Sequence, residues 1–107
     1  METIELNGKT YYSEQPDTEV SSDNLIVVGK KYFFRTVTYH LIGRVEKVTE
    51  KTIKLSDASW VADSGRFMNA IKVGALNEVE PLGDWYFERA ALVDYGEWIH
   101  ELPSKQK

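Results

Sequence analysis

The residues of this sequence best suited to ligand chemistry are arginines that lie among aromatic side chains. All four arginines, Arg35, Arg44, Arg66 and Arg89, fall in segments patterned as ordered structure, whereas many of the nine lysines occupy turns and the C-terminal tail. A guanidinium group pairs a planar anion through two parallel hydrogen bonds, and an aromatic ring can stack on a base. The rings interleaved with these arginines are Tyr32, Phe34, Tyr39, Trp60 and Trp85. The pattern predicts a pocket for an anionic or nucleotide-like ligand; the alternative is a set of internal ion pairs against core rings, which needs no ligand.

The predicted ligand-binding site adds two hydrogen-bonding side chains to these groups. Arg44 and Arg66 pair a phosphate or carboxylate, and Trp60 stacks on the ligand. Thr36 and Asp63 orient the ligand through hydrogen bonds. The full set of predicted ligand-binding residues is Arg35, Thr36, Arg44, Trp60, Asp63 and Arg66.

The sequence carries no recognisable catalytic or metal-binding arrangement. His40 and His100 are its only histidines, and neither lies in a nucleophile-base pattern. A serine such as Ser59 near His40 is a combination that arises by chance in most proteins. The acidic residues lack the fixed spacing of a calcium-binding loop, and the glycine before Arg66 lacks the further glycines and the lysine of a phosphate-binding loop. We therefore predict that the protein is not an enzyme and holds no metal ion and no cofactor.

Composition and charge narrow the class of protein. The chain has 107 residues, of which 42% are hydrophobic and 28% charged, as in ordinary globular domains. Its formal charge of -4 disfavours general nucleic-acid binding, which depends on cationic groups. No apolar run is long enough to span a bilayer, and no cysteine is present. We expect a cytoplasmic protein without a membrane partner.

The chain divides by composition into three parts. Residues 1–24 read as a hairpin turning at Asn7-Gly8, followed by an acidic linker or arm from Ser13 to Asn24. Residues 25–102 are rich in β-branched and aromatic residues and form the predicted domain. Residues 103–107 are a polar tail.

Within residues 25–102 the pattern predicts a mainly β (α+β) fold, a small bent-sheet SH3-like or Sm-like barrel with one short helix. A long strand starts at Lys31, is covered on both faces, and bends at Gly43 before a hairpin that ends near Leu55. Residues 65–73 form the helix, with Asp63 or Ser64 as its cap, which is the alternative to an anion-binding role for this segment. Further segments are an extended one over residues 76–80, a turn at residues 83–84 and a closing pair of strands at residues 91–94 and 97–100.

The aromatic content of 12% exceeds what a small core needs, and surplus aromatic residues often lie in subunit interfaces. We expect a homo-oligomer with interface residues Trp85, Tyr86 and Phe87. The alternative is a core built from large side chains.

The chain resembles small uncharacterised proteins encoded by phages and prophages. The resemblance covers roughly residues 30–101 and rests on residues 35–38, 43–44, 57–67 and 77–81, which read RTVT, GR, DASWVADSGRF and NEVEP. The resemblance implies that the protein acts in a phage context. Phage proteins of this size are commonly virion or assembly components, or accessory proteins that block a host defence.

These observations lead to one expected function and one alternative. We expect a non-enzymatic binding protein, acting in the host-cell cytoplasm, that counters host defence by sequestering a small anionic or nucleotide-like ligand or a host protein. The alternative is a structural or assembly protein of a phage particle that acts through subunit contacts. An Sm-like RNA-binding role is disfavoured by the acidic net charge.

Overall fold

The computed structural model describes residues 3–6, 9–12 and 25–107. Strands β1 (Thr3–Leu6) and β2 (Lys9–Tyr12) pair antiparallel, as the sequence predicts for an N-terminal hairpin. The predicted turn at residues 7–8 and the predicted linker at residues 13–24 lie outside the described residues.

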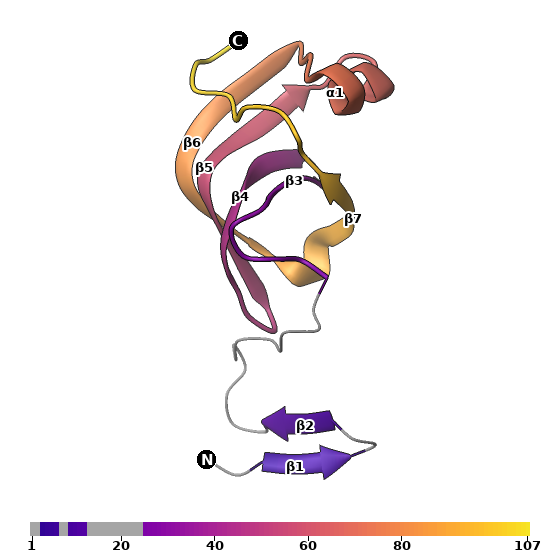
Figure 1. Ribbon diagram of the computed structural model, residues 1–107, viewed down its shortest axis with the longest axis vertical. Coiled ribbons are helices and arrows are strands. Elements are labelled where there is room, and N and C mark those ends of the chain that lie inside the picture. The colour runs from indigo at the N-terminus through magenta and orange to yellow at the C-terminus, as the bar shows by residue number, and fades with distance from the viewer. Residues whose placement is uncertain (1–2, 7–8, 13–24) are drawn as a thin grey trace.

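A single antiparallel sheet of five strands dominates residues 25–107, which confirms the mainly β prediction (Figure 1). Its strands lie in the order β6-β5-β4-β3-β7. Their bounds are Lys31–Thr36 (β3), His40–Val48 (β4), Thr52–Asp63 (β5), Glu78–Glu88 (β6) and Leu92–Glu97 (β7). One short helix, α1 (Phe67–Val73), joins β5 to β6, and a 3-10 turn, η1 (Arg89–Ala91), joins β6 to β7. No backbone pairing joins β6 to β7 within residues 25–107, so the sheet is open there.

The predicted bend at Gly43 is confirmed as a β-bulge between β4 and β5. The register shifts between Ile42 and Arg44, and Asp57 on β5 has a positive φ of 50°. A Cβ at Gly43 would lie 3.1 Å from Leu55 Cβ and 3.2 Å from Ala58 Cα. The close approach of β5 backbone and side-chain atoms therefore favours glycine at this position.

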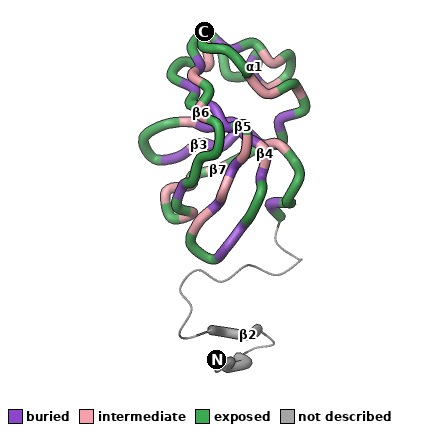
Figure 2. Tube along the Cα trace, turned by 90° about the vertical axis from the view of Figure 1, so that its left-hand side faces the viewer, coloured by how far each residue is buried: buried purple, intermediate pink, exposed green. Residues whose placement is uncertain are grey.

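Two hydrophobic clusters lie on opposite faces of the sheet, which confirms that the first strand is covered twice. Figure 2 shows buried residues concentrated in the strands. The inner cluster contains Phe34 and its neighbours Leu41, Val45, Ile53, Leu55 and Phe87. The outer cluster contains Phe33 of the same strand, together with Ile42, Val61, Ala70 of α1 and Trp98. The sheet is thus one layer with a core on each side.

The outer cluster is covered by α1 and by the segment after β7. Trp98 is buried, and its Nε1 donates to the carbonyl oxygen of Glu101 at 3.1 Å. His100 Nε2 lies 2.7 Å from the carbonyl oxygen of Ile71, near the end of α1. The polar tail also reaches the sheet, because Lys107 and Val79 exchange backbone hydrogen bonds of 2.9 and 3.1 Å.

Three segment predictions were wrong. The long strand from Lys31 is two strands, because the chain turns at residues 37–39, where the Thr36 N–H donates to the carbonyl oxygen of Tyr39 at 2.9 Å. Residues 78–88 form one continuous strand, since Pro81 is tolerated at a sheet edge. The predicted closing pair is instead β7 alone, followed by residues 98–100 without strand structure.

Candidate functional site

An apolar pocket of about 380 Å³ opens on the inner side of the sheet. Its lining residues are Tyr39, Leu41, Trp60, Leu82 and Trp85. The aromatic side chains are half-exposed, at 36% for Tyr39, 38% for Trp60 and 42% for Trp85. Large aromatic residues left in this state at a concave site are typical of ligand-binding pockets.

The β-bulge at Asp57 determines which face carries Trp60. Side chains alternate along a strand, so Leu55 and Trp60 would lie on opposite faces of a regular strand. The extra residue reverses the alternation, and Trp60 faces the same side as Leu55, directly across from Leu41. Trp85 joins it because β6 places this residue across from Leu55.

Tyr39 is held by the turn between β3 and β4. The Thr36 hydroxyl donates to the carbonyl oxygen of Tyr39 at 2.6 Å and accepts from the Tyr39 N–H at 3.1 Å. Thr36 is buried, so its hydroxyl fixes the turn from inside the fold. The sequence prediction assigned Thr36 to ligand contact, whereas its hydroxyl positions a pocket residue.

The three rings do not pack against one another, because no ring contact joins any pair of them within residues 25–107. In contrast, Phe34 contacts Phe87 with ring centroids 4.9 Å apart in the core. The space between Tyr39, Trp60 and Trp85 is therefore open to a planar or apolar group.

The pocket lining is uncharged, but one of its walls belongs to an acidic strand. No charged side chain lines the pocket in the described part of the chain. Strand β6 contains four carboxylates and no lysine or arginine. Glu80 lies across from Trp60 in the strand register, and its described contact is a 3.3 Å hydrogen bond from Gln106.

The predicted arginines do not converge on Trp60. Arg35 forms a two-pronged ion pair with Asp94, in which Nε donates to Oδ1 at 2.6 Å, and its guanidinium lies 4.9 Å from the Phe67 ring centroid. This hydrogen bond raises the pKa of Arg35 and holds the pKa of Asp94 below its ordinary value. Arg44 pairs with Asp57 at 3.1 Å. Both side chains belong to the outer face. Their ion pairs match the alternative interpretation, in which the arginines pair with carboxylates of the same chain and need no ligand.

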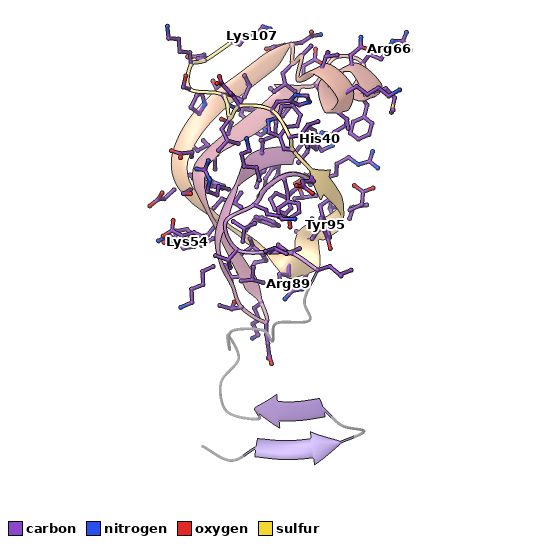
Figure 3. All side chains as sticks on the ribbon, viewed as in Figure 1. His40, Lys54, Arg66, Arg89, Tyr95 and Lys107 are labelled. Carbon is purple, nitrogen blue, oxygen red and sulfur yellow. The ribbon has the colours of Figure 1, made fainter. Side chains whose placement is uncertain are left out.

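The remaining arginines mark the two ends of the domain, as Figure 3 shows for Arg66 and Arg89. Arg66 is exposed at the start of α1. Arg89 follows β6 and donates from Nη1 to the carbonyl oxygen of Thr49 at 3.0 Å.

The N-cap residue of the helix differs from the prediction, which gave Asp63 or Ser64 as the cap. Arg66 occupies the N-cap position and makes no side-chain capping hydrogen bond. Asp63 Oδ1 accepts instead from the Gly65 N–H at 2.8 Å, so the carboxylate orders the preceding loop. Gly74 ends the helix with a left-handed conformation.

The three predicted interface residues have separate environments. Trp85 lines the pocket. Tyr86 points to the other face of β6, is 57% exposed, and has the Lys54 ammonium 5.6 Å from its ring centroid. Phe87 is buried in the inner cluster, where it packs against Phe34.

The outer face has a larger cavity of about 490 Å³, lined in part by Lys31 and Arg44. Its cations already have partners, since the Lys31 ammonium donates to the carbonyl oxygen of His100 and Arg44 pairs with Asp57. Two carboxylates, those of Asp57 and Glu101, also line it. The balance of charge gives this cavity no preference for an anion.

The two histidines lie apart from the aromatic pocket. His40 packs 5.5 Å from the Phe33 ring, and burial, followed by the charge of Arg35, lowers its pKa. His100 contacts α1 as described above. Within the described residues, no group of three histidine or carboxylate side chains is placed to hold a metal ion.

Comparison with protein-family models, with curated proteins and with solved structures finds no match to this chain. In the part of the chain that the structure describes, no helix is long and apolar enough to cross a membrane.

Proposed function

We propose that the protein is a non-enzymatic binding protein whose pocket of Tyr39, Trp60 and Trp85 takes a proline-rich segment of a partner protein. The observation that carries this proposal is the set of three half-exposed rings that leave an open, uncharged space of about 380 Å³ between them. Proline-rich segments dock in aromatic-lined grooves because their extended helix is preformed and loses little entropy on binding.

The chemistry of the lining favours this ligand over charged ones. A phosphate or nucleotide needs a cationic partner, and Arg35 and Arg44 are paired with carboxylates on the outer face. A quaternary ammonium group in an aromatic cage is stabilised further by a carboxylate in the lining, and the described lining has none. A neutral ring such as that of proline needs neither a cationic partner nor a carboxylate in the lining.

The acidic strand β6 supports a basic flank on the bound segment. Glu80 lies beside Trp60, and Asp84 precedes Trp85 in the chain. Neither carboxylate forms an ion pair within residues 25–107. Exposed charges of this kind raise the association rate of an oppositely charged partner and make it sensitive to salt.

We also propose that the curved sheet is an SH3-like barrel. The strand order β6-β5-β4-β3-β7 and the 3-10 turn before the last strand support this. The bulge at Gly43 supplies the strand bending that a small barrel requires.

The biological role that we propose is the occlusion of a host protein in a phage-encoded defence against host immunity. This part rests on the resemblance to phage and prophage proteins. Sequestration of a nucleotide and a role in particle assembly are the competing roles, and the binding experiment separates the first of them.

Tryptophan fluorescence tests the proposal directly. Trp60 and Trp85 line the pocket, whereas Trp98 is 2% exposed in the outer cluster, so a change in emission on binding reports on the pocket. The probes are a proline-rich peptide with arginine flanks, a scrambled proline-free peptide of the same charge, and adenosine and guanosine monophosphates. We expect a saturable change with the proline-rich peptide alone.

Two variants make the assignment specific. Trp60→Ala should abolish the peptide response, because it removes one wall of the pocket. Tyr86→Ala, the matched control, removes a ring of similar exposure from the opposite face of β6 and should bind as the unaltered protein does. A response to the nucleotides instead, or equal losses in both variants, would overturn the proposal.

A further inference from the structure

The two edges of the five-stranded sheet differ in their protection against strand addition. At the β6 edge, Val79 exchanges backbone hydrogen bonds with Lys107, and Pro81 lacks an N–H group. Both features block a further strand along the first part of β6. Strand β7, the opposite edge in Figure 1, contains no proline and pairs with β3 alone in the described part of the chain. Among residues 25–107, the β7 edge thus lacks the protection that the first part of β6 has.

The hydrogen-bond pattern identifies the free backbone groups of β7. The Trp98 N–H donates to the carbonyl oxygen of Lys31 at 2.9 Å, and backbone groups alternate in direction along a strand. Asp94 and Gly96 therefore also face β3, across from Arg35 and Phe33. The N–H and C=O groups of Tyr95 and Glu97 face outward.

Within residues 25–107, no contact explains the glycine at position 96. A Cβ at this position would meet no atom within 4 Å, and its φ lies outside the left-handed region that favours glycine. A glycine inside a strand weakens it, and often marks a place where another backbone approaches closely. Gly96 lies between the two residues whose backbone groups face outward.

We propose that β7 pairs antiparallel with β7 of a second copy of this chain, with the two-fold axis at Gly96. In this register, each Tyr95 forms a hydrogen-bonded pair with Glu97 of the second copy, which gives four inter-strand hydrogen bonds. The two Gly96 residues meet at the closer, non-hydrogen-bonded position.

The side chains are complementary in the same register. Val93 and Ile99 are 63% and 71% exposed, and the register places each across from the other residue of the second copy. Glu97 faces Tyr95 and Asp94 faces Trp98, so no two like charges stand opposite each other. The block along the first part of β6 disfavours a ring in which β6 of one copy pairs with β7 of the next, and the self-complementary register of β7 favours the two-fold dimer.

A pair of substitutions at one position tests this dimer. Glu97→Pro removes an outward N–H without disturbing the β3–β7 hydrogen bonds, whereas Glu97→Ala removes the same side chain and keeps the N–H. Light scattering after size exclusion should give the unaltered protein a mass about twice 12.3 kDa at high concentration. Glu97→Pro should weaken self-association by about tenfold to a hundredfold, since the two Glu97 N–H groups supply two of the four hydrogen bonds. Glu97→Ala should retain the dimer.

A second measurement tests the dimer even if the Glu97→Pro variant fails to fold. Amide hydrogen exchange of Tyr95 and Glu97 in the unaltered protein should slow as protein concentration rises. Ile99→Lys should abolish this protection, and Val73→Lys on α1, a site of similar exposure, should not. A monomer at every concentration, a larger ring, or exchange rates independent of concentration would overturn the proposal.

Discussion

The two faces of the sheet use aromatic and charged residues in opposite ways. On the outer face, Arg35 and Arg44 have carboxylate partners, and Trp98 is buried beneath the chain's own C-terminal segment. On the inner face, the rings of Tyr39, Trp60 and Trp85 remain half-exposed and do not contact one another. Satisfied groups maintain the fold, whereas groups without internal partners are available for recognition. The comparison therefore assigns stability to the outer arginines and binding to the inner rings.

The largest effect should come from the buried part of the inner face. Phe34 is fully buried and packs on Phe87, so Phe34→Ala should destabilise the protein by about 3–5 kcal/mol through lost contacts and a cavity. Urea unfolding followed by circular dichroism measures this. Trp60→Ala should cost far less, because the Trp60 ring already contacts solvent. Equal losses of stability in the two variants would remove the distinction between core rings and pocket rings.

The bulge at Gly43 gives the next largest effect, since it bends the strands that separate the faces. Gly43→Ala should cost about 1–3 kcal/mol, because the new Cβ meets Leu55 and Ala58 at 3.1 to 3.2 Å. Gly96→Ala is the matched control in the same sheet, where nothing lies within 4 Å. It should leave stability unchanged or raise it by about 0.5 kcal/mol at protein concentrations too low for self-association. Thermal unfolding of both variants measures these changes in stability. A Gly43→Ala variant as stable as the unaltered protein would contradict the packing argument.

Thr36→Val keeps all three aromatic residues of the pocket and alters only the turn that holds Tyr39. Valine keeps the shape of threonine but removes the hydroxyl that bonds both backbone groups of Tyr39. We expect a loss of about 1–2 kcal/mol in stability and weaker binding of the proline-rich peptide. Thr38→Val, at an exposed position of the same turn, should affect neither. Unchanged peptide affinity in Thr36→Val would mean that Tyr39 does not depend on this turn.

Much of the fold follows from the sequence, and the errors have physical causes. The hairpin of β4 and β5 was predicted because its turn carries polar residues and Gly43 signals the bend. The pattern does not signal the turn between β3 and β4, since Val37 and Tyr39 have the character of strand residues. The turn is closed by a local hydrogen bond from the hydroxyl of Thr36, and threonine is itself a residue type common in strands. The continuity of β6 was missed because Pro81 signals a break, and only its place at the sheet edge makes it compatible with a strand.

The candidate site was harder to predict than the fold. Trp60 and Trp85 could be selected as unusual residues, and both belong to the pocket. Their common face could not be predicted, because the extra residue at Asp57 reverses the alternation of β5. The sequence assigns the arginines to the ligand because it does not reveal their carboxylate partners. Asp94 lies 59 positions after Arg35, and such long-range pairs have no local sequence signal.

The smallest effect concerns the ionisable groups of the outer face and depends on pH. His40 has a lowered pKa through burial, so its neutral form is favoured in the folded protein. Its contribution to stability is complete above the unfolded pKa of about 6.5 and is lost as the pH falls through the lower folded value. The pKa of Asp94 is also lowered, so the ion pair with Arg35 contributes to stability above about pH 4, and this contribution disappears in more acidic solution.

Thermal unfolding from pH 8 to pH 3 measures these contributions. The stability of His40→Gln should decline less steeply below about pH 6.5 than that of the unaltered protein. Asp94→Asn should differ only slightly from the unaltered protein, because the ion pair is exposed and screened. This difference should disappear below about pH 4, where Asp94 becomes protonated. Neither substitution should change peptide binding, and a change would place the outer face in recognition and break the division between the two faces.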